Sequence, residues 1–208
     1  FMGGTGDDTF YVDRSDEITV ENADEGTDTV VATADYTLLA NVENLTLEGG
    51  GAVGTGNDLG NIILGNSSSN TLSGMDGDDT LKGKAGADTF IGGLGKDTML
   101  AGRDRHVDVF EFNDIAESGV GSAARDTVSQ FRRGHDKIDL SGIDANDSSS
   151  GDQAFGFSKG GNAKANSVWV EKQAGKMVLV RGDVDGDTTH DFEIQVSLYT
   201  MNAGDFIL

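Results

Sequence analysis

The chain contains three consecutive nine-residue units that follow one pattern, G-G-x-G-x-D-x-U-x, in which U is apolar. The units are residues 74–82, 83–91 and 92–100. Glycine at the first, second and fourth places lets the backbone adopt positive φ and turn tightly. The residues Thr-U-x that end each unit favour a very short strand. The repeat therefore predicts a β-helix in which each unit forms half a turn.

The length of a turn determines which apolar residues stack. Two units make one turn of about 18 residues, so residues 18 apart lie in one sheet and residues nine apart lie in facing sheets. We expect Ile63, Leu81 and Met99 to form one ladder, and Leu72 and Phe90 the other. Each strand buries one side chain, worth roughly 1.5 to 3 kcal/mol before entropy is subtracted. So thin a core requires another source of stability.

The aspartate at the sixth place points to a bound cation. Stacked loops bring carboxylates such as those of Asp79 and Asp97 within one strand spacing, where like charges repel unless a cation lies between them. Carboxylate and carbonyl oxygens are hard ligands that suit Ca²⁺. The candidate carboxylates are Asp79, Asp88, Asp97, Asp104, Asp108 and, in an isolated first copy of the repeat, Asp8. The candidate loop positions are Gly74, Asp76, Gly77, Gly83, Ala85, Gly86, Gly92, Leu94 and Gly95.

The repeat decays on both sides of the three units. In the units that begin at Gly56 and Gly65, Asn61 and Asn70 replace the sixth-place aspartate, so these turns should stack but bind metal weakly or not at all. On the other side, residues 108–110 fit the sixth to eighth places of the repeat, whereas residues 103–106 lack the glycines that the repeat has at its first, second and fourth places (the glycine code). A disordered glycine-rich linker is the alternative, but the regular apolar eighth place argues against it.

The charge of the chain is strongly acidic and unevenly distributed. Its 208 residues carry a net charge of −21, of which residues 1–112, with 21 acidic and 6 basic residues, hold −15. Without bound cations this half should repel itself and stay expanded. The same charge excludes nucleic acid as a partner. Cysteine is absent, so disulfides cannot stabilise the fold, and no apolar stretch is long enough to span a membrane.

Three regions follow from these patterns. Residues 1–55 hold the isolated repeat and short strand-like segments, which indicate irregular turns of the same β-helix; a small separate β-domain is the alternative. Residues 56–112 form the nonapeptide roll. In residues 113–208 the expected strands lengthen, and we expect an antiparallel sheet that caps the open end of the helix. Its expected strands are residues 126–131, 137–140, 168–170, 177–180 and 192–196.

The repeats, together with segments that follow them, match a known family. Besides residues 108–112, these segments are residues 136–143, 182–187, 191–194 and 205–208. Together they resemble the C-terminal region of serralysin-type RTX proteins. The resemblance implies an all-β fold, a parallel β-roll with Ca²⁺ between stacked loops. It also implies export from a Gram-negative bacterium by type I secretion machinery that reads an uncleaved C-terminal signal.

We find no catalytic motif in the sequence. The H-E-x-x-H signature of serralysin proteases is missing, and His106, His135 and His190 lack the spacing of metal ligands. There is neither a nucleophile elbow nor a phosphate loop. Residue 1 lies at the edge of a repeat, so we expect a fragment whose protease, lipase, epimerase or adhesin part lies upstream.

Two functions are compatible with these observations. The first is a non-catalytic module that folds on extracellular Ca²⁺ and supports secretion and stability of a larger exported protein, with dissociation constants of ~10⁻⁴ to 10⁻³ M. The second is a module of an adhesin, surface-layer protein or polysaccharide-modifying enzyme that docks glycans or a cell surface. In that case Trp169 is a candidate sugar-stacking residue, although it can equally fill the core. The acidic segment 182–191 is either a further calcium loop or a solvated hairpin turn.

Overall fold

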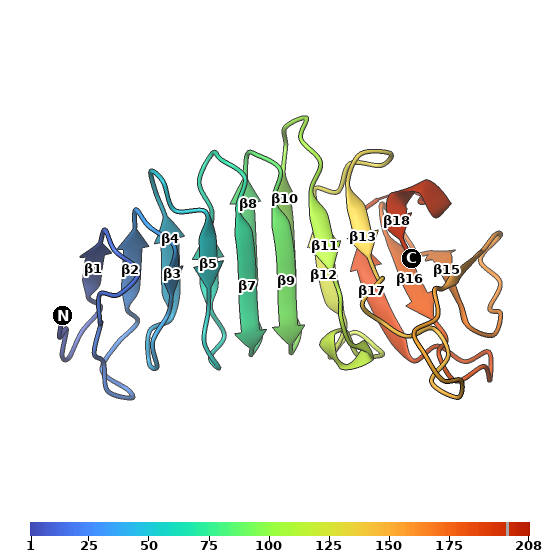
Figure 1. Ribbon diagram of the computed structural model, residues 1–208, viewed down its shortest axis with the longest axis horizontal. Coiled ribbons are helices and arrows are strands. Elements are labelled where there is room, and N and C mark those ends of the chain that lie inside the picture. The colour runs from blue at the N-terminus through green and yellow to red at the C-terminus, as the bar shows by residue number, and fades with distance from the viewer. Residues whose placement is uncertain (199) are drawn as a thin grey trace.

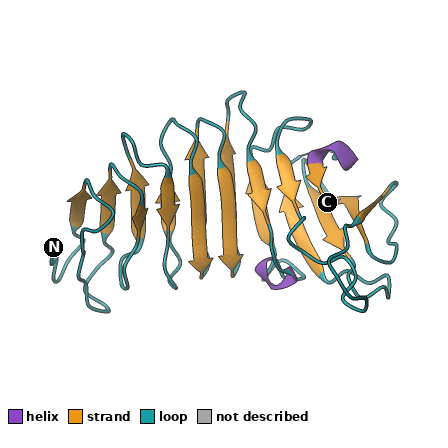
Figure 2. Ribbon diagram, viewed as in Figure 1, coloured by secondary structure: helices purple, strands orange, loops and turns teal. Residues whose placement is uncertain are grey.

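The computed structural model describes residues 1–198 and 200–208, which form an elongated roll of two facing sheets (Figure 1). Strands and loops make up almost all of this part of the chain, as Figure 2 shows. The described helices are two short 3-10 turns, η1 (Ile115–Glu117) and η2 (Ala203–Asp205). Neither these nor any other described segment is a helix able to cross a membrane. The all-β prediction is confirmed.

Each sheet is built from strands that alternate along the sequence. In spatial order, the 11-stranded sheet contains β1 (Thr9–Val12), β2 (Thr29–Ala32), β4 (Asn44–Leu47), β6 (Ile62–Leu64), β8 (Thr80–Lys84), β10 (Thr98–Gly102), β12 (Asp126–Ser129), β17 (Phe192–Val196), β16 (Val178–Gly182), β15 (Ser167–Lys172) and β14 (Gly156–Ser158). The 7-stranded sheet contains β18 (Phe206–Ile207), β13 (Lys137–Asp139), β11 (Val109–Glu111), β9 (Thr89–Leu94), β7 (Thr71–Asp76), β5 (Val53–Thr55) and β3 (Tyr36–Thr37).

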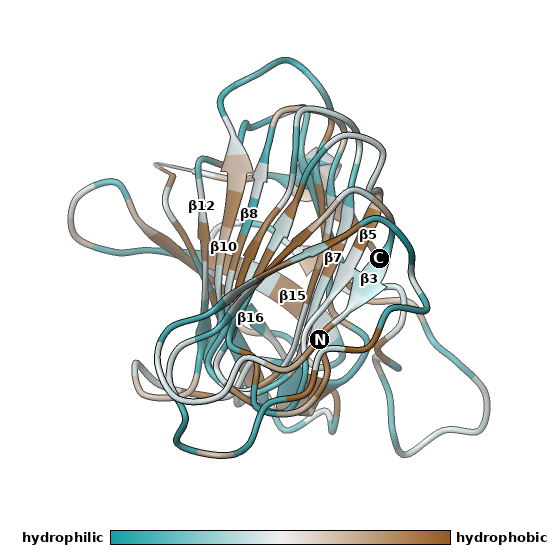
Figure 3. Cartoon of the chain, turned by 90° about the vertical axis from the view of Figure 1, so that its left-hand side faces the viewer, coloured by the Kyte–Doolittle hydropathy of each residue, from teal (hydrophilic) through white to brown (hydrophobic). Residues whose placement is uncertain are grey.

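Most strands of the roll contribute one or two buried apolar side chains to the core. Leu81 lies opposite Ile63 and Met99 in one sheet, and Leu72 lies opposite Phe90 in the other, and all five are fully buried. The 18-residue register is therefore confirmed. Figure 3 looks at the end of the molecule that carries β1 and shows hydrophobic residues on the strands between largely hydrophilic loops.

The same pairing joins residues 1–55 to the nonapeptide units. β1, β2 and β4 pair in parallel and lead to β6, while β3 and β5 lead to β7. The longer turns between these strands leave the register intact, since apolar residues such as Val30 and Leu45 still stack in line with Ile63. The N-terminal turns are thus part of one continuous roll.

The expectation of an antiparallel sheet was wrong for the first two strands after residue 112. β12 and β13 pair in parallel with β10 and β11, so the roll continues through them. β17 and β18 then pair in parallel with β12 and β13. Antiparallel pairing is limited to β15, β16 and β17. The reason is local: residues 126–128 and 136–138 keep the order Asp-x-apolar, although glycine-poor loops precede them.

The turn geometry is imposed even where the sequence lacks glycine. At the second place of the three units, Met75 and Lys84 have φ values of 82° and 76°, close to the 100° of Gly93. A left-handed conformation costs a residue with a side chain roughly 1 to 2 kcal/mol. Stacking of the loops therefore outweighs local backbone preference at these two positions.

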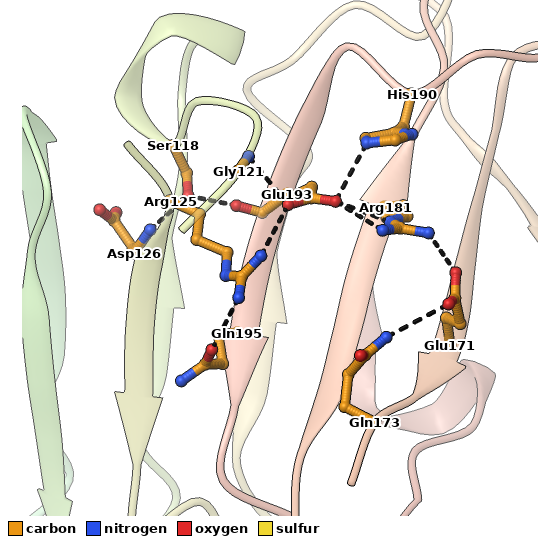
Figure 4. Close-up of polar contacts among 10 residues, drawn as sticks. All are labelled: Ser118, Gly121, Arg125, Asp126, Glu171, Gln173, Arg181, His190, Glu193 and Gln195. Carbon is orange, nitrogen blue, oxygen red and sulfur yellow. Dashed lines mark hydrogen bonds and ion pairs between the residues drawn. The ribbon is translucent and has the colours of Figure 1, made fainter. Parts of the chain in front are cut away.

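A buried carboxylate connects the antiparallel strands to the roll (Figure 4). The side chain of Glu193, on β17, is 3% exposed and accepts hydrogen bonds from Arg125 at 3.0 Å, Arg181 at 2.8 Å and the backbone N–H of Gly121 at 3.0 Å. His190 Nε2 lies 3.0 Å from Oε1 of Glu193, the oxygen that also contacts Arg181. Glu193 thus holds together the loop before β12 and the sheet beyond it.

Removing this carboxylate should loosen the C-terminal sheet. Glu193→Ala leaves two largely buried guanidinium groups without their main partner, which typically costs about 3 to 5 kcal/mol. Glu171→Ala is the matched control, because the side chain of Glu171 is 43% exposed and contacts the same Arg181; an exposed pair contributes about 0 to 1 kcal/mol. Urea denaturation of both variants measures the difference. Equal losses would contradict the role given to Glu193.

Candidate metal sites

Buried aspartates form a line along each edge of the roll. One edge, the lower one in Figure 1, carries the loops that precede β8, β10 and β12, and the other carries the loops that precede β9, β11 and β13. Each strand begins at its aspartate or directly after it, which places the carboxylates in register. They are Asp79, Asp97 and Asp126 on the first edge and Asp88, Asp108 and Asp136 on the second, and none is more than 3% exposed.

On the first edge, each carboxylate accepts a hydrogen bond from the turn before it. Oδ1 of Asp79 accepts from the backbone N–H of Asn61 at 2.6 Å, and Oδ1 of Asp97 accepts from that of Asp79 at 2.8 Å. Asp126 continues the line by accepting from Asp97 at 2.7 Å. One oxygen of each carboxylate is therefore held in place by the stacked backbone.

The second edge repeats this arrangement. Oδ1 of Asp88 accepts from the N–H of Asn70 at 2.8 Å, Asp108 accepts from Asp88 at 2.9 Å, and Asp136 accepts from Asp108 at 3.2 Å. The two-residue insertion before Asp108 leaves the line unbroken, because the loop and not the strand absorbs the extra residues.

The second oxygen of four of these carboxylates has no partner in the described protein. Oδ2 is buried and without a hydrogen bond in Asp79, Asp88, Asp97 and Asp126. In the nonapeptides this oxygen faces the first-place glycine: a Cβ at Gly74, Gly83 or Gly92 would overlap Oδ2 of Asp79, Asp88 or Asp97 respectively. The carbonyl oxygen of Gly92 lies 2.5 Å from the same Cβ position at Gly74. Glycine thus leaves a space lined by carboxylate and carbonyl oxygens.

Burial makes the charged form of these groups unfavourable. Desolvation is the largest cause that raises the pKa, to about 7 for Asp79, Asp97 and Asp108, about 6 for Asp88 and about 9 for Asp126. Neighbouring carboxylates raise it further, as Asp97 does for Asp79 and Asp126, while the backbone N–H bonds lower it. The protein supplies too little positive charge for these anions, and a divalent cation would supply it.

The two asparagine turns show how the fold satisfies the same position without a cation. Nδ2 of Asn61 donates to the carbonyl oxygens of Val42 at 3.3 Å and Glu43 at 3.2 Å, while its Oδ1 accepts from Asn57 at 2.7 Å. Asn70 likewise donates to Gly51 at 3.1 Å. Neither amide has an unpaired buried atom among the described residues. The stacking of these turns is confirmed, and their weak or absent metal binding stays a prediction.

The remaining predicted positions differ in their surroundings. Gly77, Gly86 and Gly95 have positive φ values of 114°, 115° and 136°, as their turns require, whereas Asp76 and Leu94 end strands and are exposed, and Ala85 is half-buried. Asp104 accepts from the N–H of Gly86 at 2.7 Å and of His106 at 2.8 Å. The second of these bonds is the main cause of its lowered pKa. Asp8 lies at the far end of the first edge, beside Asp28.

Three aspartates of these lines were missing from the sequence prediction: Asp28, Asp126 and Asp136. Their spacing of 20, 29 and 28 residues from the preceding member departs from 18 because the intervening loops are longer. The signal that could have revealed them is the order aspartate, any residue, apolar residue, which each of them keeps at the start of a strand. Strand-start patterns are thus more informative here than the glycine code.

Comparisons with known proteins agree with this architecture. The chain superposes on two solved subunits of the mannuronan C5-epimerase of Azotobacter vinelandii. Subunit AlgE6R3 gives a TM-score of 0.54 at 23% identity over 72% of this chain and 78% of that one. Subunit AlgE6R2 gives 0.51 at 21% identity over 76% and 91%. These likenesses show the β-roll fold.

Sequence comparison adds a curated relative and a family. The endo-1,3-1,4-beta-glycanase ExsH of Rhizobium meliloti is 47% identical over 62 residues, which are 30% of this chain and 13% of that protein. The chain thus matches only a small part of the length of this relative. The family described as Peptidase M10 serralysin C terminal matches residues 2–208. With its stacked repeats and parallel roll, the chain belongs to this serralysin C-terminal family.

Proposed function

We propose that this chain is a non-catalytic module that binds several Ca²⁺ ions and folds around them outside the cell as part of a larger exported protein. The observation that carries the proposal is the set of four buried Oδ2 atoms without partners, each held beside stacked loops. Leaving such anions bare is costly, whereas a cation between the loops would satisfy them. The paired amides of Asn61 and Asn70 are the internal contrast.

The ligands we propose are all oxygens. Carboxylates of Asp79, Asp88, Asp97 and Asp108 would hold the ions, together with carbonyl oxygens at the first, third and fourth places of the nonapeptides, and Asp126 would extend the first edge. Calcium accepts six to eight oxygen ligands in flexible geometry, which suits a mixture of carboxylate and carbonyl groups. A bound ion would supply the positive charge that these buried carboxylates lack.

Calcium binding would couple folding to location. In a compartment with little Ca²⁺, the net charge of −21 disfavours a compact chain. Outside the cell, ions would bring the loops together, and each formed turn would template the next. Because metal binding and loop stacking share the same contacts, the transition should be steep.

An unfolded state would also suit type I secretion. In the folded chain, β18 pairs with β13, and buried Asp205 accepts from the N–H of Gly134 at 2.7 Å. A C-terminal signal within these residues would therefore be accessible to the secretion machinery only before the roll forms. We place any catalytic activity of the larger protein outside these residues.

Glycan docking through Trp169 has less support. The residue is 3% exposed, and its ring packs edge-on against His190 with centroids 6.4 Å apart. A stacking platform needs an open aromatic face. Trp169 is buried without belonging to the core cluster, because it lies on the sheet face that carries Arg181, opposite the core residue Val168.

Calcium should drive the folding of the chain. Titration of calcium-free protein should give a cooperative increase in strand content and a decrease in hydrodynamic radius near ~10⁻⁴ to 10⁻³ M Ca²⁺, the usual range of extracellular calcium modules. Far-UV circular dichroism and size-exclusion chromatography measure the two changes, with K⁺ at matched ionic strength as control. A chain that is equally compact and equally β-rich in chelator would overturn the proposal.

A single carboxylate should control one calcium site without breaking the roll. Asp88→Asn places in this turn the same amide that Asn70 carries in the turn stacked against it, so the fold should persist. The calcium affinity of the affected site should fall by about tenfold or more. Isothermal titration calorimetry measures this loss. Asp152→Asn removes the same charge from an exposed residue, and Thr98→Ser alters a neighbouring strand; both should leave calcium affinity unchanged. Equal effects in all three variants would rule out the ligand assignment.

Stability should depend on pH in opposite directions with and without calcium. The pKa values of Asp79, Asp97 and Asp108 are raised from 3.8 to about 7 in the folded chain. In calcium-free buffer, their contribution to stability is therefore present below pH 4 and is lost as the pH rises through 7. With saturating Ca²⁺, which displaces these protons, stability should rise over the same range. Strand content in chelator, from far-UV circular dichroism at pH 5 to 8, and urea midpoints with Ca²⁺ over the same range test this, and a calcium-free chain that gains strand content with pH would contradict it.

A further inference from the structure

Three carboxylates converge at the end of the molecule that carries β1. Asp8 precedes β1, Asp28 precedes β2, and Glu21 lies in the turn between these strands. One carboxylate oxygen of each lies within 4.8 Å of those of the other two. Glu21 and Asp28 are 6% and 1% exposed, and Asp8 is half-buried. The cluster lies on the same edge of the roll as Asp79 and Asp97.

One oxygen of this cluster has no partner. Oε2 of Glu21 accepts from the N–H of Gly4 at 3.3 Å, but its Oε1 is buried without a hydrogen bond. A Cβ at Gly3 would overlap this Oε1 and would lie 2.7 Å from Oδ2 of Asp8. Two carboxylate oxygens from different turns are therefore directed at the same small space, which only glycine leaves open.

The cluster differs from the nonapeptide sites by an additional acid. Met2 bridges to Val20, so Gly3 stacks on Glu21 as Gly74 stacks on Gly92. The first place, a glycine in the repeats, is thus a glutamate in this turn. Asp8 and Asp28 keep the backbone ladder, since the N–H of Asp8 donates to Oδ1 of Asp28 at 2.8 Å. The two stacked loops therefore bring together the sixth-place carboxylates of Asp8 and Asp28 and the first-place carboxylate of Glu21.

The protein offers little positive charge to this cluster. None of the ion pairs among the described residues includes any of the three acids, and Arg14 pairs with Asp16. Backbone N–H groups compensate only in part, through the bonds that Gly4 donates to Glu21 and Asp8 donates to Asp28. Three clustered carboxylates with so few donors would destabilise the turn in the absence of a cation.

We propose that Asp8, Glu21 and Asp28 form a divalent-cation site of the Ca²⁺ class that is separate from the nonapeptide sites. Affinity for Ca²⁺ increases with the number of charged ligands, so a site with three carboxylates should fill before those with two. Its ion would join the loops before β1 and β2 and hold the first turn of the roll. The proposal goes beyond calcium-driven folding of the nonapeptides, which does not require this site.

Native mass spectrometry at graded free Ca²⁺ tests the site by counting ions. Glu21→Gln should lose the first ion to bind, and Glu21→Ala, which removes the ligand entirely, should hold one ion fewer at saturation. Asp24→Asn is the matched control, because this exposed residue lies in the same turn and has a φ of 63° that asparagine tolerates. The control should bind as many ions as the wild-type chain.

Hydrogen exchange gives a second readout, in which Glu21→Gln has opposite effects depending on whether a cation binds at the cluster. If a cation binds here, Glu21→Gln should abolish the calcium-dependent protection of residues 3–8 and 21–28 while that of residues 74–100 persists. If no cation binds, neutralising a buried unpaired carboxylate should leave this turn equally or better protected. The second result would overturn the inference even if every variant folds.

The counts also separate this inference from the proposed function. A wild-type chain that binds no ion would overturn both. Nonapeptide sites that fill normally, with equal ion counts in wild type, Glu21→Ala and Asp24→Asn, would overturn the N-terminal site alone.

Discussion

The structure depends on the stacking of like charges inside a thin β-roll. Aspartates stack in register along both edges, and a backbone N–H of the neighbouring turn donates to Oδ1 of Asp79, Asp97, Asp126, Asp88 and Asp108. The other oxygen is buried and unpaired in Asp79, Asp88, Asp97 and Asp126. A core of one or two apolar side chains from most strands cannot easily offset that cost, because each contributes only roughly 1.5 to 3 kcal/mol. Stability of the fold is thereby tied to what neutralises its loops.

In other parts of the roll, the buried polar side chains have partners within the protein. At Asn61 and Asn70, an amide donates to the loop carbonyls of the preceding turn, so the buried polar atoms at these positions have protein partners. At the other end, Glu193 accepts hydrogen bonds from Arg125 and Arg181 and joins the antiparallel strands to β12. Protein cations thus neutralise a buried carboxylate in the cap, whereas none of the ion pairs among the described residues includes Asp79, Asp88, Asp97 or Asp126. This contrast supports the proposal that calcium neutralises the central loops.

Much of this organisation could be predicted because the repeat acts locally. Glycine positions define the turns, and the apolar eighth place defines the ladder, so Ile63, Leu81 and Met99 could be aligned by counting. The prediction failed for β12 and β13, where long loops replace the glycine code and hide a continuing register. Asp126 and Asp136 were missed for the same reason. Loop length varies freely when the strands at both ends of the loop remain paired, and counting residues then loses the register.

Residues close together along the chain specify the repeat unit, the parallel roll, the acidic loops and the family to which the chain belongs. The folded chain, in contrast, sets which carboxylates keep an unpaired oxygen, how Glu193 is shared between Arg125 and Arg181, and that Glu21 takes the place of a glycine beside Asp8 and Asp28. Pairing and burial are properties of neighbours in space. Those neighbours come from turns about 18 or more residues apart, and the loops between them set which side chains meet.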